Sequence, residues 1–268
     1  MDLYQMRAEP GKADIDMRRF LHRVVGLALF GITHGLRVDY AHALHILAPH
    51  CQQAAQIHMT AALVLLGYIK YRIDECLGIV YWSAQASWIE YPKLIVSTDA
   101  SLGNICYRSG YGIVIELLGA TIYVAAGTIK AKVTYTSMAE FMAHVSGLKV
   151  GISLHSHMFE IGLAPIIQEA ATANKLAQYA EQDRILMLCD NMAASKVATT
   201  GQSMKKMRHM ALKELFVLDS VGRQHDIMFQ PGKFMKADIV TKDVKEPAKL
   251  YRKVYSMLWT YFKPQKNG

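Results

Sequence analysis

The chain has 268 residues, of which 52% are apolar and 19% are charged, so it is too hydrophobic to be disordered and long enough to bury a core. Its net charge is +8, and the excess is confined to residues 205–268, which hold 14 Lys and Arg against 6 Asp and Glu. That asymmetry favours a polyanionic partner, such as nucleic acid or an acidic membrane surface, or else a basic solvated tail.

The first 90 residues are predicted to form about three helices. Apolar residues recur at helical spacing after Asp39, a candidate N-cap, and again across residues 57–68. The pattern changes near residues 88–92, where we place a domain boundary. The prediction is therefore a helical module over residues 1–90 and a second domain over residues 91–268 that ends in a basic tail.

In residues 91–268, β-type runs alternate with helical segments. Three strands are predicted at 93–98, 112–117 and 121–126, the last two joined as a hairpin around Gly119. The later elements are a helix from Ser137, a strand at 185–189, helices after Asp190 and over 205–221, a strand at 226–229 and a helix from about Lys236. No element is assigned to 151–183. This order predicts an α/β fold with a mixed sheet covered by helices.

Other classes of protein are disfavoured. Four cysteines are far apart and lack the spacing of a zinc site or a disulfide framework: Cys51, Cys76, Cys106 and Cys189. They are interpreted as reduced thiols in an intracellular protein, cytoplasmic or nuclear. The first ten residues contain no apolar run, so no secretory signal is expected. Residues 40–69 are uncharged, but His and Gln interrupt them, so no membrane span is expected.

Four acidic residues are predicted to lie at the ends of elements. They are Asp99 closing the first strand, Glu140 in the first turn of the next helix, Asp190 closing the strand at 185–189, and Asp238 opening the last helix. If the strands that end in Asp99 and Asp190 are parallel neighbours, these ends meet where α/β sheets usually carry their sites. Carboxylates gathered without basic partners repel one another unless divalent cations neutralise them, which indicates magnesium.

Each of these residues also has a purely structural interpretation. Glu140 ends a capping-box pattern that begins at Ser137. Asp190 fits a turn before a helix, Asp99 an Asx turn, and Asp238 a partner of the helix dipole. The residue pattern alone leaves both interpretations open.

Four segments, VSTDAS, TYTSMAEFMAH, LCDNMAASKV and KADIVTK, resemble in order and rough spacing the ribonuclease H domain of copia-type LTR retrotransposon polyproteins. The matching segments of that family read SDAD, SSTEAEY, CDNQSAI and ADIFTK. Residues 18–82 are similar to the segment between the polymerase palm and ribonuclease H, with Arg37-Val38-Asp39 in place of arginine, proline and aspartate. Met138 replaces the first acid of the family's TEAEY, and residues 151–183 are longer than the family's connection.

The resemblance implies a ribonuclease H-like mixed five-stranded sheet flanked by helices. It further implies an endonuclease that hydrolyses the RNA strand of RNA-DNA hybrids with two Mg²⁺ ions, for which Mn²⁺ can substitute. Asp99 would bridge both ions, with Glu140 and Asp190 on one and Asp238 on the other. No Tyr-x-Asp-Asp motif is present, so a polymerase palm, if one acts with this chain, is expected on another polypeptide.

A compact basic stretch is a candidate nucleic-acid contact: Lys205, Lys206, Arg208 and His209. A solvated helix face is the alternative. Two other functions stay open, because a fold does not establish an activity. One is a co-opted, non-catalytic ribonuclease H-like protein that binds nucleic acid or scaffolds a ribonucleoprotein. The other is a structure-specific DNA nuclease or resolvase, which would require a dimer.

Overall fold

The computed structural model describes residues 15–35, 37–73, 94–105, 108–117, 120–163, 184–200 and 211–242. The elements before the sheet are α1 (Ile15–Gly35), η2 (Val38–Tyr40), α2 (Ala41–Leu47), η3 (Ala48–Gln53) and α3 (Gln56–Ile73). The elements from the sheet onward are β1 (Leu94–Ile105), β2 (Arg108–Leu117), β3 (Ala120–Thr128), α4 (Thr136–Glu160), β4 (Ile185–Cys189), α7 (Met192–Thr200), α8 (Ala211–Ser220), β5 (His225–Phe229), η6 (Gly232–Phe234) and η7 (Lys236–Val240). The η elements are short 3₁₀ helices.

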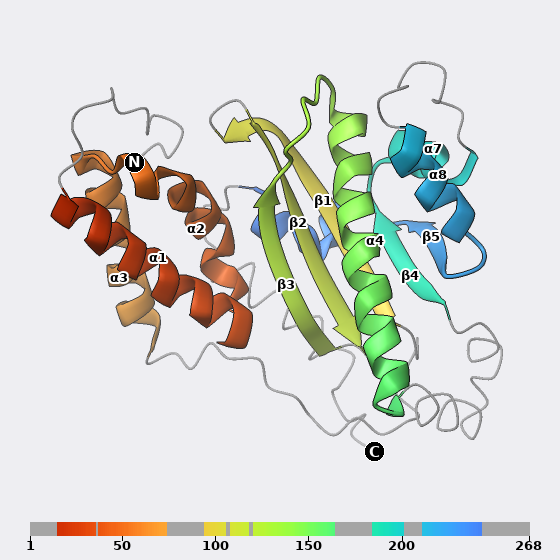
Figure 1. Cartoon of the computed structure of the whole chain (residues 1–268), viewed down its shortest axis with the longest axis horizontal. Coiled ribbons are helices and arrows are strands. Elements are labelled where there is room, and N and C mark those ends of the chain that lie inside the picture. The colour runs from red at the N-terminus through yellow and green to blue at the C-terminus, as the bar shows by residue number, and fades with distance from the viewer. Residues whose placement is uncertain are drawn as a thin grey trace, which may run out of the picture.

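The five described strands form one mixed sheet in the order β3-β2-β1-β4-β5 (Figure 1). β2 is antiparallel to both β1 and β3, whereas β4 is parallel to β1 and β5 is parallel to β4. Among the described strands, β2 alone therefore runs against the others. With helices on both faces, this is the topology of the ribonuclease H-like fold, so the predicted fold class is confirmed.

Each face of the sheet is covered by its own layer. α4 crosses one face, and its side chains share a buried apolar cluster with α7 and α8 that includes Val96, Phe141 and Met187 (Figure 1). The opposite face carries η7 and the helical module, which for the described residues means α1 to α3 with η2 and η3. These elements share a second cluster with the sheet residues Val114 and Val124. Burial of apolar surface thus joins the N-terminal helices to the sheet.

A buried ion pair fixes the connection between α1 and α2. Arg37 donates from Nε and Nη2 to the two carboxylate oxygens of Asp39, at 2.9 and 2.8 Å. The hydroxyl of Tyr68, on α3, donates to the same carboxylate at 3.0 Å. The prediction of Asp39 as an N-cap is wrong, because this carboxylate is engaged by Arg37 and Tyr68, and Tyr40 precedes α2 without a side-chain cap bond.

Two elements extend beyond their predicted ends. β1 continues past Asp99, because its pairing with β2 runs on to Ser101 opposite Gly110. Asp99 therefore lies inside the strand and does not close it. α4 begins at Thr136 and continues to Glu160, so part of the unassigned stretch 151–183 is helical. Because the helix begins before Ser137, the prediction that Glu140 lies in the first turn is wrong, since it lies in the second, and the alternative interpretation as a capping box does not hold either.

The C-terminal elements also differ from those predicted from the sequence. Residues 236–240 form a 3₁₀ helix, not the opening of an α-helix, so Asp238 lies within η7. The predicted helix over 205–221 corresponds to α8 from Ala211 onward. The start of that helix, the domain boundary at 88–92 and the chain beyond 242 lie outside the described residues. Within the part of the chain that is described, no helix has the length and apolar character to cross a membrane.

Gly147 allows α4 to pack directly on β1, because a Cβ there would lie 3.1 Å from Val96 Cγ1 and closer still to Thr98. At Gly67, on α3, a Cβ would meet nothing within 4 Å. We expect Gly147→Ala to lower the free energy of unfolding by about 1 to 2 kcal/mol, since overpacking outweighs the helix propensity of Ala. Gly67→Ala should raise it by up to about 1 kcal/mol. Urea denaturation measures both, and equal effects would contradict the tight α4–β1 contact.

Candidate metal centre

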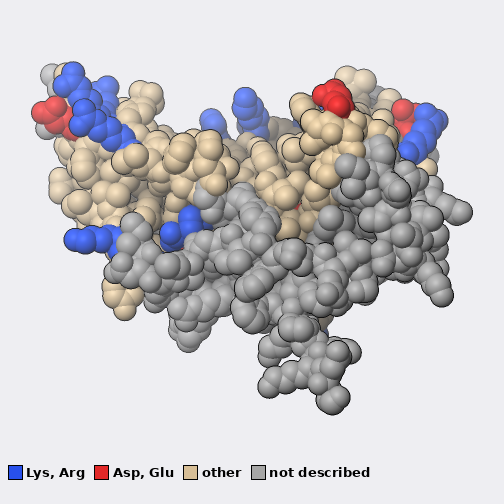
Figure 2. All heavy atoms as spheres, turned by 90° about the horizontal axis from the view of Figure 1, so that it is seen from below, with Lys and Arg blue, Asp and Glu red and all other residues tan. Residues whose placement is uncertain are grey.

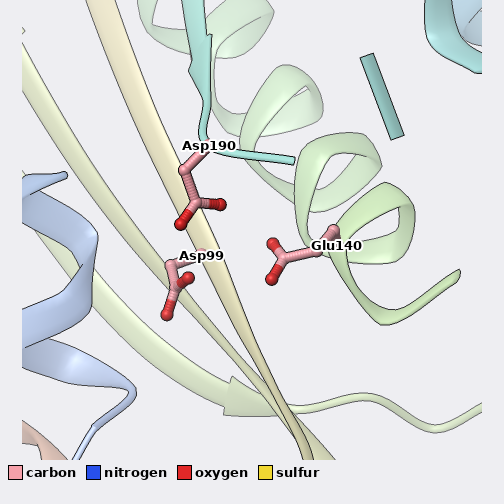
Figure 3. Close-up of side chains that lie close together, drawn as sticks. All are labelled: Asp99, Glu140 and Asp190. Carbon is pink, nitrogen blue, oxygen red and sulfur yellow. The ribbon is translucent and has the colours of Figure 1, made fainter. Parts of the chain in front are cut away.

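Three carboxylates from separate elements converge beside β1, the central strand of the sheet (Figure 3). Asp99 comes from β1, Glu140 from α4 and Asp190 from the residue that follows β4. One oxygen of each lies within 4.8 Å of one oxygen of the other two. Asp99 and Glu140 are only 1% and 5% exposed, and Asp190 is partly buried. Within the described part of the chain, these three residues form a group of possible metal ligands with this spacing.

The parallel pairing of β1 with β4 brings Asp99 beside Asp190. Ser97 is in register with Leu188, and each acid stands two residues further along its own chain. The condition under which the ends of these two segments meet, parallel pairing as neighbours, is therefore fulfilled. Side chains alternate along a strand, so Asp99 projects from the same face as Ser97, opposite to the Val96 side that packs on α4.

Gly112 of β2, which pairs with Asp99 of β1, makes room for the segment that carries Asp238. A Cβ at this glycine would lie 2.7 Å from Thr241 Cγ2 and 3.1 Å from the carbonyl oxygen of Ala237. Neither atom could remain where it is. The missing side chain therefore allows η7 to lie against β1 and β2 next to the buried carboxylate.

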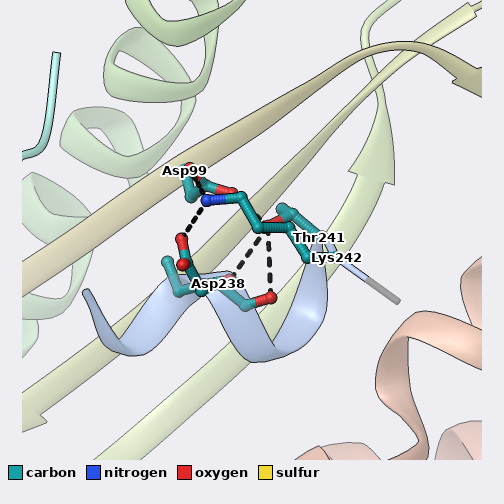
Figure 4. Close-up of polar contacts among 5 residues, drawn as sticks. Asp99, Asp238, Thr241 and Lys242 are labelled. Carbon is teal, nitrogen blue, oxygen red and sulfur yellow. Dashed lines mark hydrogen bonds and ion pairs between the residues drawn. The ribbon is translucent and has the colours of Figure 1, made fainter. Parts of the chain in front are cut away.

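Asp238 stands beside the group of three and is paired with a lysine (Figure 4). Lys242 Nζ lies 2.6 Å from Asp238 Oδ1 and 3.5 Å from Asp99 Oδ1. The hydroxyl of Thr241 donates to the other oxygen of Asp99. The sequence interpretation did not place Thr241 and Lys242 in this centre, although their spacing of three and four residues from Asp238 places them on one side of a helical turn.

Burial raises the pKa values of all three converging carboxyl groups. It raises the pKa of Glu140 to about 9, and the negative charges of Asp99 and Asp190 contribute to the rise. Burial raises the pKa of Asp99 to about 6, against the opposing effects of the Thr241 hydrogen bond and the Lys242 charge. The pKa of Asp190 is also raised, again chiefly by burial. A cation bound among these groups would favour their ionised forms.

Lys242 stays charged in this setting. Burial works to lower its pKa, but the hydrogen bond to Asp238 and the charges of Asp99, Asp238 and Asp190 outweigh burial and raise the pKa above its ordinary value. The side chain is 47% exposed, so the ammonium faces both solvent and the acidic group. The centre therefore holds one fixed positive charge of its own.

The donor set fits a hard divalent cation. The three converging groups are carboxylates, the ligand type that suits Mg²⁺ and Mn²⁺. Cys189 lies next to Asp190 in the chain, but burial raises the pKa of its thiol to about 12. The thiolate is the form that binds metals, so this cysteine does not compete as a soft ligand. Asp99, Glu140 and Asp190 are thus suited to hold magnesium or manganese.

The predicted nucleic-acid contacts Lys205, Lys206, Arg208 and His209 lie outside the described residues. On the face seen in Figure 2, the Lys and Arg side chains of the described residues stand in separate groups. The described residues on this face thus form no continuous basic surface. The basic stretch stays a prediction.

No protein-family model matches the chain, and no curated protein matches it in sequence. Among solved structures, a crystal structure of the prototype foamy virus protease-reverse transcriptase is similar, with 16% sequence identity and a TM-score of 0.32. The similarity covers 66% of this chain, which spans only 22% of the viral chain. The assignment of the fold therefore rests on the strand topology.

Proposed function

We propose that this chain is a metal-dependent endonuclease of the ribonuclease H type that hydrolyses the RNA strand of RNA-DNA hybrids. The observation that carries the proposal is the convergence of Asp99, Glu140 and Asp190 within 4.8 Å on a ribonuclease H-like sheet. The resemblance of four motif segments to copia-type ribonuclease H domains supports the hybrid as substrate. The net charge of +8 is compatible with a nucleic-acid partner.

In this proposal, Asp99, Glu140 and Asp190 hold a divalent ion through carboxylate oxygens. Such an ion, when bound, would lower the pKa of a coordinated water and so supply the nucleophile for in-line attack on the phosphodiester. The hydroxyl of Thr241 fixes the orientation of Asp99 through its hydrogen bond. Packing around the buried Asp99 and Glu140 side chains keeps them in place before substrate arrives.

Glu140 has a second role in the proposal. Its position on α4 places a carboxylate on the side of the centre opposite η7, and we assign it to the ribose 2′-hydroxyl groups of the substrate. The 2′-hydroxyl is the group by which a protein distinguishes RNA from DNA at a given position. A preference for the RNA strand would then come from the same residue that binds the ion.

A second candidate function is a non-catalytic, co-opted ribonuclease H-like protein that binds nucleic acid. The pairing of Lys242 with Asp238 and Asp99 favours this alternative, because the ammonium offsets part of the acidic charge without any ion.

Incubation of the purified chain with a labelled RNA-DNA hybrid in Mg²⁺, in Mn²⁺ and in EDTA tests the proposal. A DNA duplex and a single-stranded RNA of the same sequence serve as matched substrates. We expect cuts in the RNA strand of the hybrid only when a divalent ion is present. Tight hybrid binding without cleavage in either metal would support the non-catalytic alternative. Preferential cleavage of the DNA duplex would support a DNA nuclease.

A further inference from the structure

Large apolar side chains are exposed on both segments that leave β4 and β5. Met192 is 60% exposed, Phe229 46% and Phe234 41%. Cys189, the last residue of β4, is in register with Phe229, the last residue of β5, so the two segments start side by side. Single exposed apolar residues are common on protein surfaces, but these three lie on the segments that adjoin Asp190.

The segment after β5 passes directly beside the candidate metal centre. The amide of Gln230 donates to the carbonyl oxygen of Cys189 at 2.9 Å. A Cβ added to Gly232 would lie 3.2 Å from Asp190 Oδ2, so the missing side chain lets η6 lie against this carboxylate. Phe234 is only two residues further along the chain, and two residues span at most about 7 Å. Its ring is therefore within reach of a substrate bound at the centre.

The backbone fixes Phe234 at the surface. Its amide donates to the carbonyl oxygen of Pro231 at 2.9 Å, and the amide of Met235 donates to that of Gly232 at 3.0 Å, which closes the 3₁₀ turn. Met235 is buried in the apolar cluster that η7 shares with the helical module. The closed turn and the buried residue that follows it thus hold the exposed ring in place.

Lys233 adds a positive charge to this aromatic surface. Its Nζ lies 4.6 Å from the centroid of the Phe234 ring, which is the geometry of a cation–π contact. Proteins that bind single-stranded nucleic acid without sequence preference combine basic side chains along the backbone with aromatic rings on which bases stack. An exposed phenyl ring beside an ammonium provides both elements.

We propose that Phe234 and Lys233 bind an unpaired nucleotide next to the hybrid, with its base stacked on the phenyl ring and its phosphate on the ammonium. A base inside the hybrid already stacks on its neighbours, so an unpaired base offers the free face that the ring needs. The preferred substrate is then a hybrid that continues into a single-stranded overhang. This inference rests on the proposed function, because it requires a hybrid at the acidic centre.

Fluorescence anisotropy in EDTA measures the affinity of the full chain for a short labelled hybrid that is blunt, has an RNA overhang or has a DNA overhang. For the wild type, we expect at least one overhang to tighten binding about 5-fold or more, the smallest factor typical of one stacked base. The two overhangs show which strand supplies the nucleotide. In Phe234→Ala, the ratio of the affinities for overhanging and blunt hybrid should fall close to one.

Further variants separate stacking from other contacts. Phe234→Tyr keeps the aromatic ring and should keep the preference for the overhang, whereas Phe234→Leu keeps only the apolar character and should lose it. Lys233→Gln should reduce the slope of log affinity against log salt by about 0.7 for the overhanging hybrid. Phe159→Ala is the matched control, because it removes an equally exposed ring near the far end of α4, and it should keep the preference.

The outcomes distinguish this inference from the proposed function. Equal affinities of the wild type for blunt and overhanging hybrids, or no binding of either, would overturn the inference. A preference that survives in Phe234→Ala or in Phe234→Leu would also overturn it, because stacking on the ring would then not be its source. These measurements need neither metal nor cleavage, whereas the proposed function fails if no hybrid is cleaved in Mg²⁺ or Mn²⁺. Cleavage without any preference for an overhang would leave the proposed function intact.

Discussion

Asp99→Asn is expected to reduce metal-dependent cleavage of the hybrid by about 100-fold or more, because even the outer partners of metal ligands cost about 10- to 100-fold when changed. The amide oxygen of Asn is neutral and binds a divalent ion weakly, yet it keeps the shape of Asp and can still accept the Thr241 hydroxyl. Asp190→Asn should act in the same direction. Single-turnover cleavage of the labelled hybrid measures both rates, and circular dichroism verifies that the variants are folded.

Asp219→Asn provides the matched control for this experiment. Asp219 is an exposed carboxylate on α8 that pairs with Arg223 at 3.1 Å, so the same chemical change is made outside the centre. Its cleavage rate should equal that of the wild type. An unchanged rate for Asp99→Asn would remove Asp99 from the centre, whereas a large loss for Asp219→Asn would show that the assay responds to another property.

Without divalent ions, the free energy of unfolding should decrease as the pH rises from about 4.5 to about 9. These limits are the ordinary pKa of Glu140 and its value in the folded protein, which burial and then the charges of Asp99 and Asp190 raise. Asp99, whose pKa rises from 3.8 to about 6, contributes in the lower part of the same range. In this window the folded state binds more protons than the unfolded state, so each rise in pH favours unfolding. The total loss should be on the order of several kcal/mol.

Urea denaturation in EDTA at a series of pH values measures this dependence. Glu140→Gln should make the profile flatter, because the variant has no carboxyl group to ionise at this position. Glu160→Gln, the same change at the exposed end of α4, should leave the profile unchanged. Added Mg²⁺ should stabilise the wild type most at high pH, where the carboxylates are ionised. A profile that is equally steep in Glu140→Gln would refute the role of Glu140 burial.

The parts of the fold that follow from local pattern were predictable. The run ILMLC is compact and apolar, as expected for a central parallel strand buried on both faces, and Asp190 directly follows it. The continuation of β1 through SLGNI was not predictable, because this segment, interrupted by Gly103 and Asn104, becomes a strand by pairing with β2. For that reason Asp99 appeared to close a strand that in fact runs past it.

The site shows the same division between local and distant information. The motif segments indicate all four acidic residues, but they do not tell which carboxylates converge. The convergence of Asp99 and Asp190 depends on the pairing of β1 with β4, and the approach of η7, which carries Asp238, depends on Gly112, far from it in the sequence. Likewise, no local pattern joins Asp39 to Tyr68, whose hydroxyl reaches it from 29 residues away. Partners brought together by tertiary packing leave no trace in local periodicity.

The apolar cluster that the helical module shares with the sheet restricts which substitutions this chain can accept during evolution. Leu44 of α2, Val124 of β3 and Ala237 of η7 belong to one cluster, so a larger side chain on the helices displaces neighbours that support Asp238. Protein interiors tolerate volume changes poorly unless a neighbour compensates. Substitutions in the helices and under the acidic residues are therefore coupled, and homologous chains should show paired size changes between them. Transplanting residues 94–242 to another scaffold would require a replacement for that apolar partner surface.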